Sequence, residues 1–313
     1  MTKVLTKKTY IWIFLFLSVL IAAAFLITCN AYGTLLKNDF LEKQSFLSDQ
    51  TAYALGNYLG SLEEQIILFS NKNELPKKLA FQMMPTYSLQ FESLDFWQIE
   101  VFPAWENVVA WSVEQRPASF PALSIAQIRQ ILGEEDSAWY PVPAGTDNPG
   151  ETYLAYLRRI TYDGATAGYV LAWVNPSSIE HILSLYMIDY LHSPNALFSS
   201  YTAAQIEIGA HSYPCGKYPV EPELLNRVSD APLLANGKYL IRSDTGQNGI
   251  HLVLSGDAGQ LWRAIGFIRQ VFLFAYLTVI LLLSFCLYFF IRKIDSVMKT
   301  LFSKLAVELH QQT

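Results

Sequence analysis

Two long apolar runs without a charged residue lie near opposite ends of the chain. The first covers residues 10–28, nineteen residues, and the second covers residues 271–291, twenty-one residues. A helix needs about 20 apolar residues to cross the roughly 30 Å hydrocarbon core of a bilayer. The runs therefore predict two transmembrane helices, which separate two short tails from a loop of roughly 240 residues.

Charge is distributed unequally between the tails and the loop. Residues 1–9 and 292–313 together hold seven Lys or Arg and two Asp or Glu, whereas residues 29–270 hold 15 and 25. Lys and Arg in short segments that flank a span stay on the cytoplasmic side. We therefore expect both termini in the cytoplasm, the loop outside it, and the lipid bilayer as a partner.

A cleaved signal peptide is the alternative for the first run. The run is longer than a usual signal-peptide core, and no small-x-small cleavage site follows it. Leu26-Ile27-Thr28-Cys29 fits a lipoprotein cleavage site poorly because Thr precedes the Cys. A retained span is the preferred interpretation. Of the three cysteines only Cys215 lies well inside the loop, so a hydrophobic core rather than disulfides is expected to stabilise it.

Long helices are predicted at both ends of the loop. Apolar residues recur at three- and four-residue spacing from Tyr32 to Phe69, which is typical of an amphipathic helix that continues from the first span. Asn71-Lys72-Asn73 and Pro76 end this pattern. No proline follows Pro232, so a helix from Ala258 is expected to continue into the second span.

Between these helices the pattern changes to short helices and strands, without a visible internal repeat. The first part predicts helices at 75–84 and 123–132 (capped by Ser124), strands at 96–102 and 107–113, a loop at 141–150, strands at 152–160 and 167–174 around an Asp163-Gly164 turn, and a helix from Pro176. The second part predicts strands at 204–208, 239–242 and 250–255, a helix at 221–228 and a turn at 246–249.

Some of these segments resemble a known family. The stretch Tyr153–Ile160, the Asp163-Gly164 turn, the glycine-led strand Ala167–Asn175 and the helix through Ile179 follow the order found at the end of a PAS-like unit. With the flanking spans, the chain resembles the double Cache (PAS-like) extracellular sensor region of bacterial membrane receptors. The best match is to Gram-positive two-component sensor histidine kinases, although the chain lacks the kinase region.

This resemblance implies an α/β (α+β) extracytoplasmic domain of two PAS-like units on a long N-terminal helix, flanked by two transmembrane helices. The expected organisation is a cytoplasmic tail (1–9), a first span (10–28), a long membrane-proximal helix (29–73), a membrane-distal Cache unit (74–190), a membrane-proximal Cache unit (191–257), a helix continuous with the second span (258–291) and a HAMP-like helix start (292–313). Such a receptor binds a small extracellular solute and forms a homodimer in the bacterial plasma membrane.

The chain departs from the family in its ligand anchors and in its C-terminal tail. Amino-acid-binding members carry Arg two residues before a Trp-Tyr pair and Asp after the glycine-led strand, but here Ser137 precedes Trp139-Tyr140, and Trp173 and Asn175 stand where the Asp is expected. The usual anchors of an amino acid are thus not visible. Residues 292–313 hold no kinase region, so the chain is either a truncated receptor or a module that signals to a separate cytoplasmic kinase or other output protein.

Large aromatic residues gather in the first predicted α/β part. Core packing is the plain interpretation, because such side chains bury roughly 150–250 Å² each. The alternative is a pocket wall for a sugar, amine or peptide. Arg158 and Arg159 face opposite sides of a strand, so one of them is placed to bind an anion. The candidate ligand-binding residues are Trp97, Trp111, Trp139, Tyr140, Tyr156, Arg158, Arg159, Tyr169 and Trp173.

Other chemistry has little support in the sequence. The five histidines are scattered without metal-ligand spacing, and there is no Gly-x-Ser-x-Gly elbow, so neither a metal site, a catalytic site nor a cofactor is expected. Basic residues are too few and dispersed to bind nucleic acid. A membrane-bound solute sensor is the preferred function. A membrane-tethered adaptor for a protein or a wall polymer is the alternative, and an extracellular enzyme is the third class.

Overall fold

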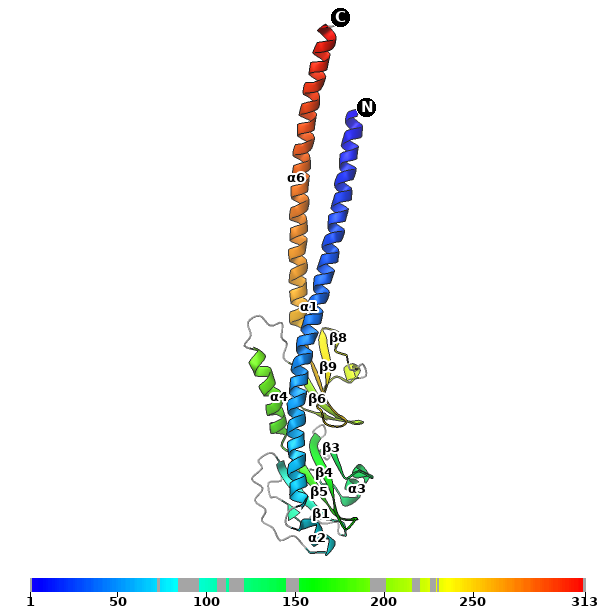
Figure 1. The fold of residues 1–313 in the computed structure, drawn as a ribbon, viewed down its shortest axis with the longest axis vertical. Helices are drawn as coiled ribbons and strands as arrows, with labels where there is room; N and C mark the ends of the chain where they lie inside the picture. Colours follow the sequence, from blue (N-terminus) through cyan, green and yellow to red (C-terminus); the bar gives the residue numbers. More distant parts are fainter. Residues whose placement is uncertain are drawn as a thin grey trace. The chain divides into compact units, whose positions relative to one another are not determined.

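The computed structural model describes residues 2–71, 74–83, 96–105, 111–112, 121–144, 152–191, 201–215, 220–225, 229 and 231–311. The chain divides into two compact units. One consists of Met1–Asp39 and Leu261–Thr313, and the other of Phe40–Gln260. The long predicted helices are confirmed as α1 (Thr2–Asn71) and α6 (Gly259–Gln311) (Figure 1).

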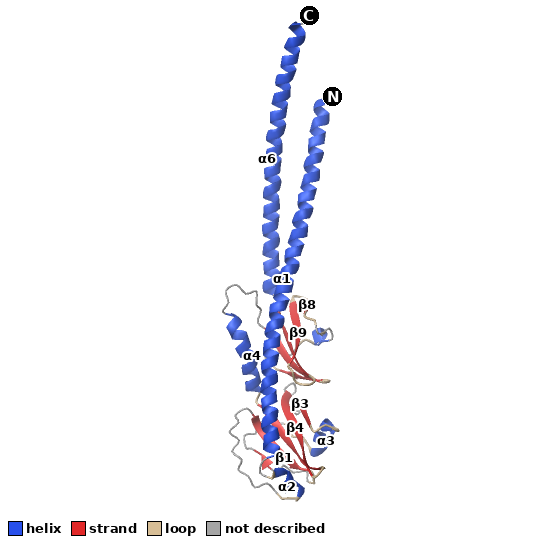
Figure 2. Ribbon diagram, viewed as in Figure 1, coloured by secondary structure: helices blue, strands red, loops and turns tan. Residues whose placement is uncertain are grey.

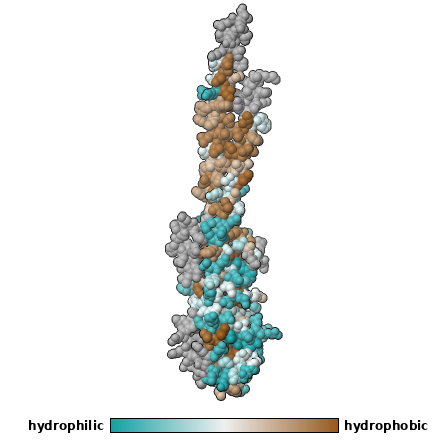
Figure 3. Space-filling model, viewed as in Figure 1, coloured by the Kyte–Doolittle hydropathy of each residue, from teal (hydrophilic) through white to brown (hydrophobic). Residues whose placement is uncertain are grey.

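In the first unit, α1 and α6 run side by side. The ring of Phe25 lies 6.1 Å from that of Phe272 and 5.9 Å from that of Tyr276, and the ammonium of Lys37 lies 4.9 Å from the ring of Trp262. Each helix is long and apolar enough to cross a membrane, and none of its apolar window is buried by protein. The outward apolar side chains are the brown surface of this helix pair in Figure 3.

The second unit contains two antiparallel sheets of five strands each (Figure 2). Their strand orders are β2-β1-β5-β4-β3 and β7-β6-β10-β9-β8, so the second sheet repeats the connectivity of the first, although the sequence shows no repeat. The strands of the first sheet are β1 (Phe96–Pro103), β2 (Trp111–Ser112), β3 (Ser137–Pro143), β4 (Thr152–Tyr162) and β5 (Ala165–Val174). Those of the second are β6 (Tyr201–Ile208), β7 (His211–Pro214), β8 (Leu233–Ala235), β9 (Lys238–Asp244) and β10 (Ile250–Asp257).

The short helices follow their sequence signals. They are α2 (Leu75–Ala80), α3 (Ile125–Leu132), α4 (Pro176–Leu191) and α5 (Pro222–Leu225). Ser124 caps α3 as predicted, and its hydroxyl accepts a hydrogen bond from the backbone N–H of Gln127. Asp163 and Gly164 both have positive φ, 49° and 77°, as a tight turn between two strands requires.

Three strands were not predicted by the sequence pattern. Pro141 and Pro143 favour a loop at residues 141–143. That prediction is wrong, because these residues belong to β3. Proline is tolerated on an edge strand, where its nitrogen faces away from the ladder. β7 and β8 have only four and three residues, too few for a periodic signal. Parts of the predicted 107–113, 141–150 and 221–228 segments lie outside the described residues.

Helix α1 packs against both sheets of the second unit. Ala52, Leu55, Leu59 and Leu62 of α1 share one buried cluster with residues of β4 and β5, of α4, and of β6 and β10. Further along α1, Ile66 and Phe69 cover one side of the first sheet together with α2. We call this side the α1 face. The opposite side, which packs against α3, is the α3 face.

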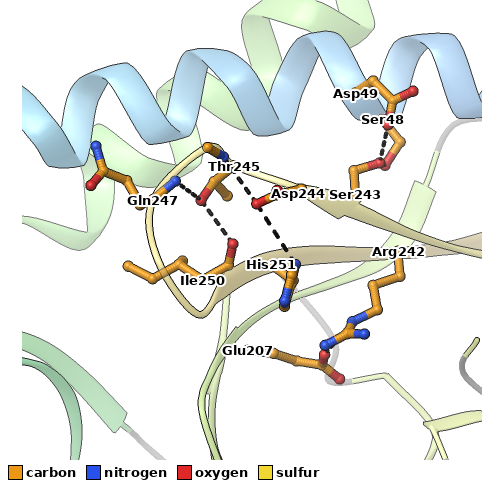
Figure 4. A network of polar contacts seen from close by, with 11 residues as sticks. Ser48, Asp49, Glu207, Arg242, Ser243, Asp244, Thr245, Gln247, Ile250 and His251 are labelled. Atoms are coloured by element: carbon orange, nitrogen blue, oxygen red, sulfur yellow. Dashed lines mark hydrogen bonds and ion pairs between the residues drawn. The ribbon is translucent and has the colours of Figure 1, made fainter. Parts of the chain in front are cut away.

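Two glycines allow the β9–β10 hairpin to approach α1 closely. A Cβ atom on Gly56 would lie 1.9 Å from the carbonyl oxygen of Thr245, and one on Gly60 would lie 2.7 Å from Nε2 of Gln247. The hydroxyl of Ser243 on β9 lies 2.8 Å from that of Ser48 and donates to Oδ1 of Asp49 at 2.6 Å (Figure 4). Helix and hairpin are therefore joined by buried polar contacts as well as by apolar packing.

Candidate functional site

An open groove of about 780 Å³ lies between α3 and the edge strand β3. Its volume falls within the range of small-molecule sites, roughly 300–1,000 Å³. One residue of β7, at the edge of the second sheet, completes the lining. We call it the α3 groove; its lining residues are Pro121, Ala122, Leu123, Gln127, Gln130, Ile131, Ala138, Trp139, Tyr140, Val142, Pro143 and His211.

The sequence of α3 positions one wall of the groove. Ile125, Ile128 and Leu132 are buried against the sheet, which leaves Gln127 and Gln130 exposed. A capping box also fixes Gln127, because its Oε1 accepts a hydrogen bond from the backbone N–H of Ser124 at 2.9 Å. The side-chain N–H groups of Gln127 are then left as donors.

Tyr140 and His211 form the end of the groove where the two sheets meet. Their rings are 4.8 Å apart in an edge-to-face arrangement. Tyr140 lies on β3 and His211 on β7, and both strands are at the edge of their sheet. A solute bound here would contact both sheets.

Two of the predicted site residues, Trp139 and Tyr140, line the α3 groove, although the ring of Trp139 packs on the opposite α1 face. Three others, Trp97, Tyr169 and Trp173, lie on the α3 face. Trp173 is 1% exposed and belongs to the core of that face. Trp111 lies on β2, and its side chain is outside the described set.

The two adjacent arginines occupy different environments. Arg159 lies beside α3, where Nη2 donates to the carbonyl oxygen of Gly133 at 2.7 Å. Arg158 lies opposite Ser137 in the β3–β4 ladder and hydrogen-bonds the hydroxyl of Tyr156. The sequence-based expectation that one of them anchors an anion stays a prediction.

Tyr156 lies in a polar cluster on the α1 face. Its hydroxyl donates to Oε1 of Glu63 on α1 at 2.9 Å, and the ring of Trp139 is 4.8 Å away. Burial raises the pKa of Tyr156 to about 12, the carboxylate of Glu63 acts in the same direction, and hydrogen bonds from Ser137 and Arg158 oppose the increase. Three predicted site residues, Trp139, Tyr156 and Arg158, therefore meet at a link between the first sheet and α1.

Sequence reasoning missed several polar residues of this region. Gln127, Gln130 and His211 line the groove, and Glu63 binds Tyr156. The exposed face of α3 was a usable signal for the two glutamines, whereas His211 joins the groove only through the packing of the two sheets. On the α3 face, Gln98 and Glu100 of β1 are also buried, and Nε2 of Gln98 donates to Oε1 of Glu100 at 2.5 Å.

Within the described parts of the chain, no three His, Cys, Asp or Glu side chains come together as a metal site would require. Cys215 is a buried free thiol, and burial raises its pKa.

Comparisons with known proteins identify similar structures but no family. No protein-family model matches the chain, and no curated protein matches it. The ligand-binding domain of the Pseudomonas fluorescens chemoreceptor CtaA, solved with L-isoleucine, is 12% identical with a TM-score of 0.47, over 74% of this chain and 98% of that one. The sensory domain of the Campylobacter jejuni chemoreceptor Tlp3 is 12% identical with a TM-score of 0.46, over 73% and 98%.

A third similar structure is the ligand-binding domain of the Pseudomonas aeruginosa PAO1 chemoreceptor PctC in complex with GABA. It is 13% identical with a TM-score of 0.42, over 69% of this chain and 99% of that one. Similarity at this level assigns neither a ligand nor a function to this chain.

Proposed function

We propose that this chain is the input part of a bacterial plasma-membrane receptor for a small extracellular solute. Its loop forms two PAS-like units, the solute binds in the α3 groove, and α1 and α6 pass the ligand state to a cytoplasmic kinase or another output protein. The observation that carries the proposal is the continuity of α1. This helix holds the first apolar run and also packs on both sheets.

Contacts of α1 with each sheet support a coupling role. Glu63 binds Tyr156 of the first sheet, and Asp49 binds Ser243 of the second. A ligand shifts the equilibrium between two arrangements of α1 and α6 only if its affinity for the two arrangements differs. A solute that touches both sheets through Tyr140 and His211 has the placement needed to favour one arrangement.

Orientation across the membrane follows from charge. The tails carry seven basic and two acidic residues, while the loop is acidic, so the loop is placed outside and both termini in the cytoplasm. The two ends of the helix pair lie on the same side of the first unit, as this topology requires (Figure 1).

A symmetric homodimer is part of the proposal. Phe46, Tyr53 and Leu68 of α1 are 52%, 66% and 59% exposed. Their spacing places them within about 60° of one another around the helix axis. An apolar stripe of this kind suits the same stripe on a second copy, since isologous interfaces are self-complementary.

Cysteine cross-linking in membranes tests the dimer. After Cys29 and Cys286 are replaced by serine, Phe46→Cys and Tyr53→Cys are expected to form disulfide-linked dimers efficiently. Ser45→Cys, which lies on another side of α1, is the matched control and should cross-link weakly. Equal yields at all three positions would contradict the proposed interface.

Thermal unfolding of the full chain in lipid nanodiscs tests solute binding. Sugars, amines, amino acids, peptides and organic acids are screened, and at least one class is expected to stabilise the protein. A solute at 100 times its Kd adds about 2.7 kcal/mol, which raises Tm by roughly 5–10 °C. Tyr140→Ala should remove the shift, whereas Tyr162→Ala, another half-buried tyrosine of the first sheet, should keep it.

The second candidate function is a membrane-tethered adaptor for a protein partner or a wall polymer. The exposed stripe on α1 is the observation that favours it, because a different protein could cover the same residues. A flat thermal screen together with no cross-linked dimer would favour the adaptor over the sensor. The remaining sequence-predicted contacts, Trp97, Trp111, Tyr156, Arg158, Arg159, Tyr169 and Trp173, stay predictions.

A further inference from the structure

The described lining of the α3 groove contains no Asp, Glu, Lys or Arg. Its polar side chains are two amides, a phenol and an imidazole, from Gln127, Gln130, Tyr140 and His211. A charged solute that leaves water needs an oppositely charged or strongly hydrogen-bonding partner, because desolvating an unpaired ion is costly. The lining therefore suits a neutral solute better than an amino acid, an amine or an organic acid.

The edge of β3 disfavours an extended peptide. In an antiparallel ladder the N–H and C=O of one residue point to the same side. Pro141 and Pro143 are paired with Leu154 and Thr152 of β4, and neither has an N–H to offer an added strand. A peptide in the groove would find acceptors at these two positions but no donors, and strand addition depends on both.

The remaining surface combines apolar patches with hydrogen-bonding groups. Leu123, Ile131 and Val142 provide the apolar part. The amides, the phenol and the imidazole supply both donors and acceptors. A pyranose ring has the same division, since C–H groups cover its faces and hydroxyl groups surround its rim.

We propose that the α3 groove binds an uncharged, polyhydroxylated solute, a mono- or disaccharide. In this arrangement the sugar ring packs on Tyr140, and its hydroxyl groups bind Gln130 and His211, so the ligand holds the first and second sheets together. This inference rests on the proposed sensor function and specifies the ligand class of the same groove.

Isothermal titration of the full chain in nanodiscs tests the inference. The probes are glucose, galactose, xylose, arabinose, maltose and cellobiose, with glutamate, lysine, putrescine and citrate as charged comparisons. We expect one neutral sugar to bind and no charged probe to do so. His211→Phe keeps a ring beside Tyr140 but loses the nitrogen atoms, and Gln130→Leu keeps the volume but loses the amide. Each should weaken sugar binding about tenfold.

His181→Phe is the matched control, because His181 is exposed on α4 and does not line the groove. It should leave affinity unchanged. If a charged probe binds and both groove variants weaken it, the ligand class is wrong but the sensor function stands. If a sugar binds with the same affinity in all variants, the groove is the wrong location. If no probe of either kind binds, both this inference and the proposed function lose their support.

Discussion

Replacing Gly56 with alanine is expected to destabilise the protein by about 3 kcal/mol or more, although alanine is the better helix former. The added Cβ would lie 1.9 Å from the carbonyl oxygen of Thr245 and 2.9 Å from its carbonyl carbon. These are backbone atoms of the segment that joins β9 to β10, so relief requires the hairpin to move away from α1. The gain in helix propensity, at most about 1 kcal/mol, does not offset this.

Thermal unfolding followed by circular dichroism measures the effect, and Tm should fall by roughly 6–12 °C. Gly33→Ala is the matched control in the same helix, because its Cβ would meet only Cγ2 of Ile265 at 4.0 Å, an ordinary contact. That variant should be neutral or slightly stabilised. A Gly56→Ala protein as stable as Gly33→Ala would show that the hairpin does not depend on this close approach.

Alkaline solution is expected to unfold the protein steeply above about pH 10. Burial raises the pKa values of Tyr156, to about 12, and of Tyr213 and Cys215. The unfolded chain loses these protons near pH 8.5 for Cys and 10 for Tyr, while the folded chain still holds them. Stability is therefore fully present below the unfolded pKa values and is lost as pH rises toward the folded ones.

The magnitude follows from linkage. Each group contributes up to about 1.4 kcal/mol per pH unit in the interval between its two pKa values. Three groups acting together lower the free energy of unfolding by roughly 4 kcal/mol per unit near pH 11, which is comparable with the whole stability of a typical domain. Urea unfolding at several pH values between 8 and 11 measures the slope of the free energy of unfolding against pH.

Removing the buried hydroxyls separates this effect from a general sensitivity to base. Tyr156→Phe and Tyr213→Phe should each flatten the loss of stability with pH, by up to about 1.4 kcal/mol per unit. Tyr162→Phe, at a half-buried position at the end of β4, is the control and should leave the slope unchanged. Identical slopes in all three variants would rule out the buried phenols as the cause.

The sequence predicted the elements whose signal is local. An uncharged apolar run of about 20 residues indicates a transmembrane segment by its composition alone. The helices α1 and α6 were confirmed because their apolar spacing continues without a proline. Ser124 before α3 and Asp163-Gly164 between β4 and β5 were confirmed for the same reason, since a cap or a tight turn depends on a few adjacent residues.

The candidate site was predicted only in part, because it depends on residues that are distant in the sequence. The aromatic content of the region suggested Trp139 and Tyr140, but nothing near His211 indicated that β7 would place it 4.8 Å from Tyr140. Alternation along β4 separated Arg158 from Arg159, yet it could not show that Tyr156 would meet Glu63 across 93 residues.

The amino-acid sequence alone therefore determined two apolar helices, an acidic loop between them, and most of the strands and turns, because each of these follows from composition or from spacing along the chain. Only the tertiary structure decided which aromatic residues are buried in the core and which line a groove. It also decided that the second sheet repeats the strand order of the first, and that the β9–β10 hairpin packs closely against α1 at Gly56. Those features arise from contacts between distant segments, and the free energy of such contacts has no local pattern in the chain.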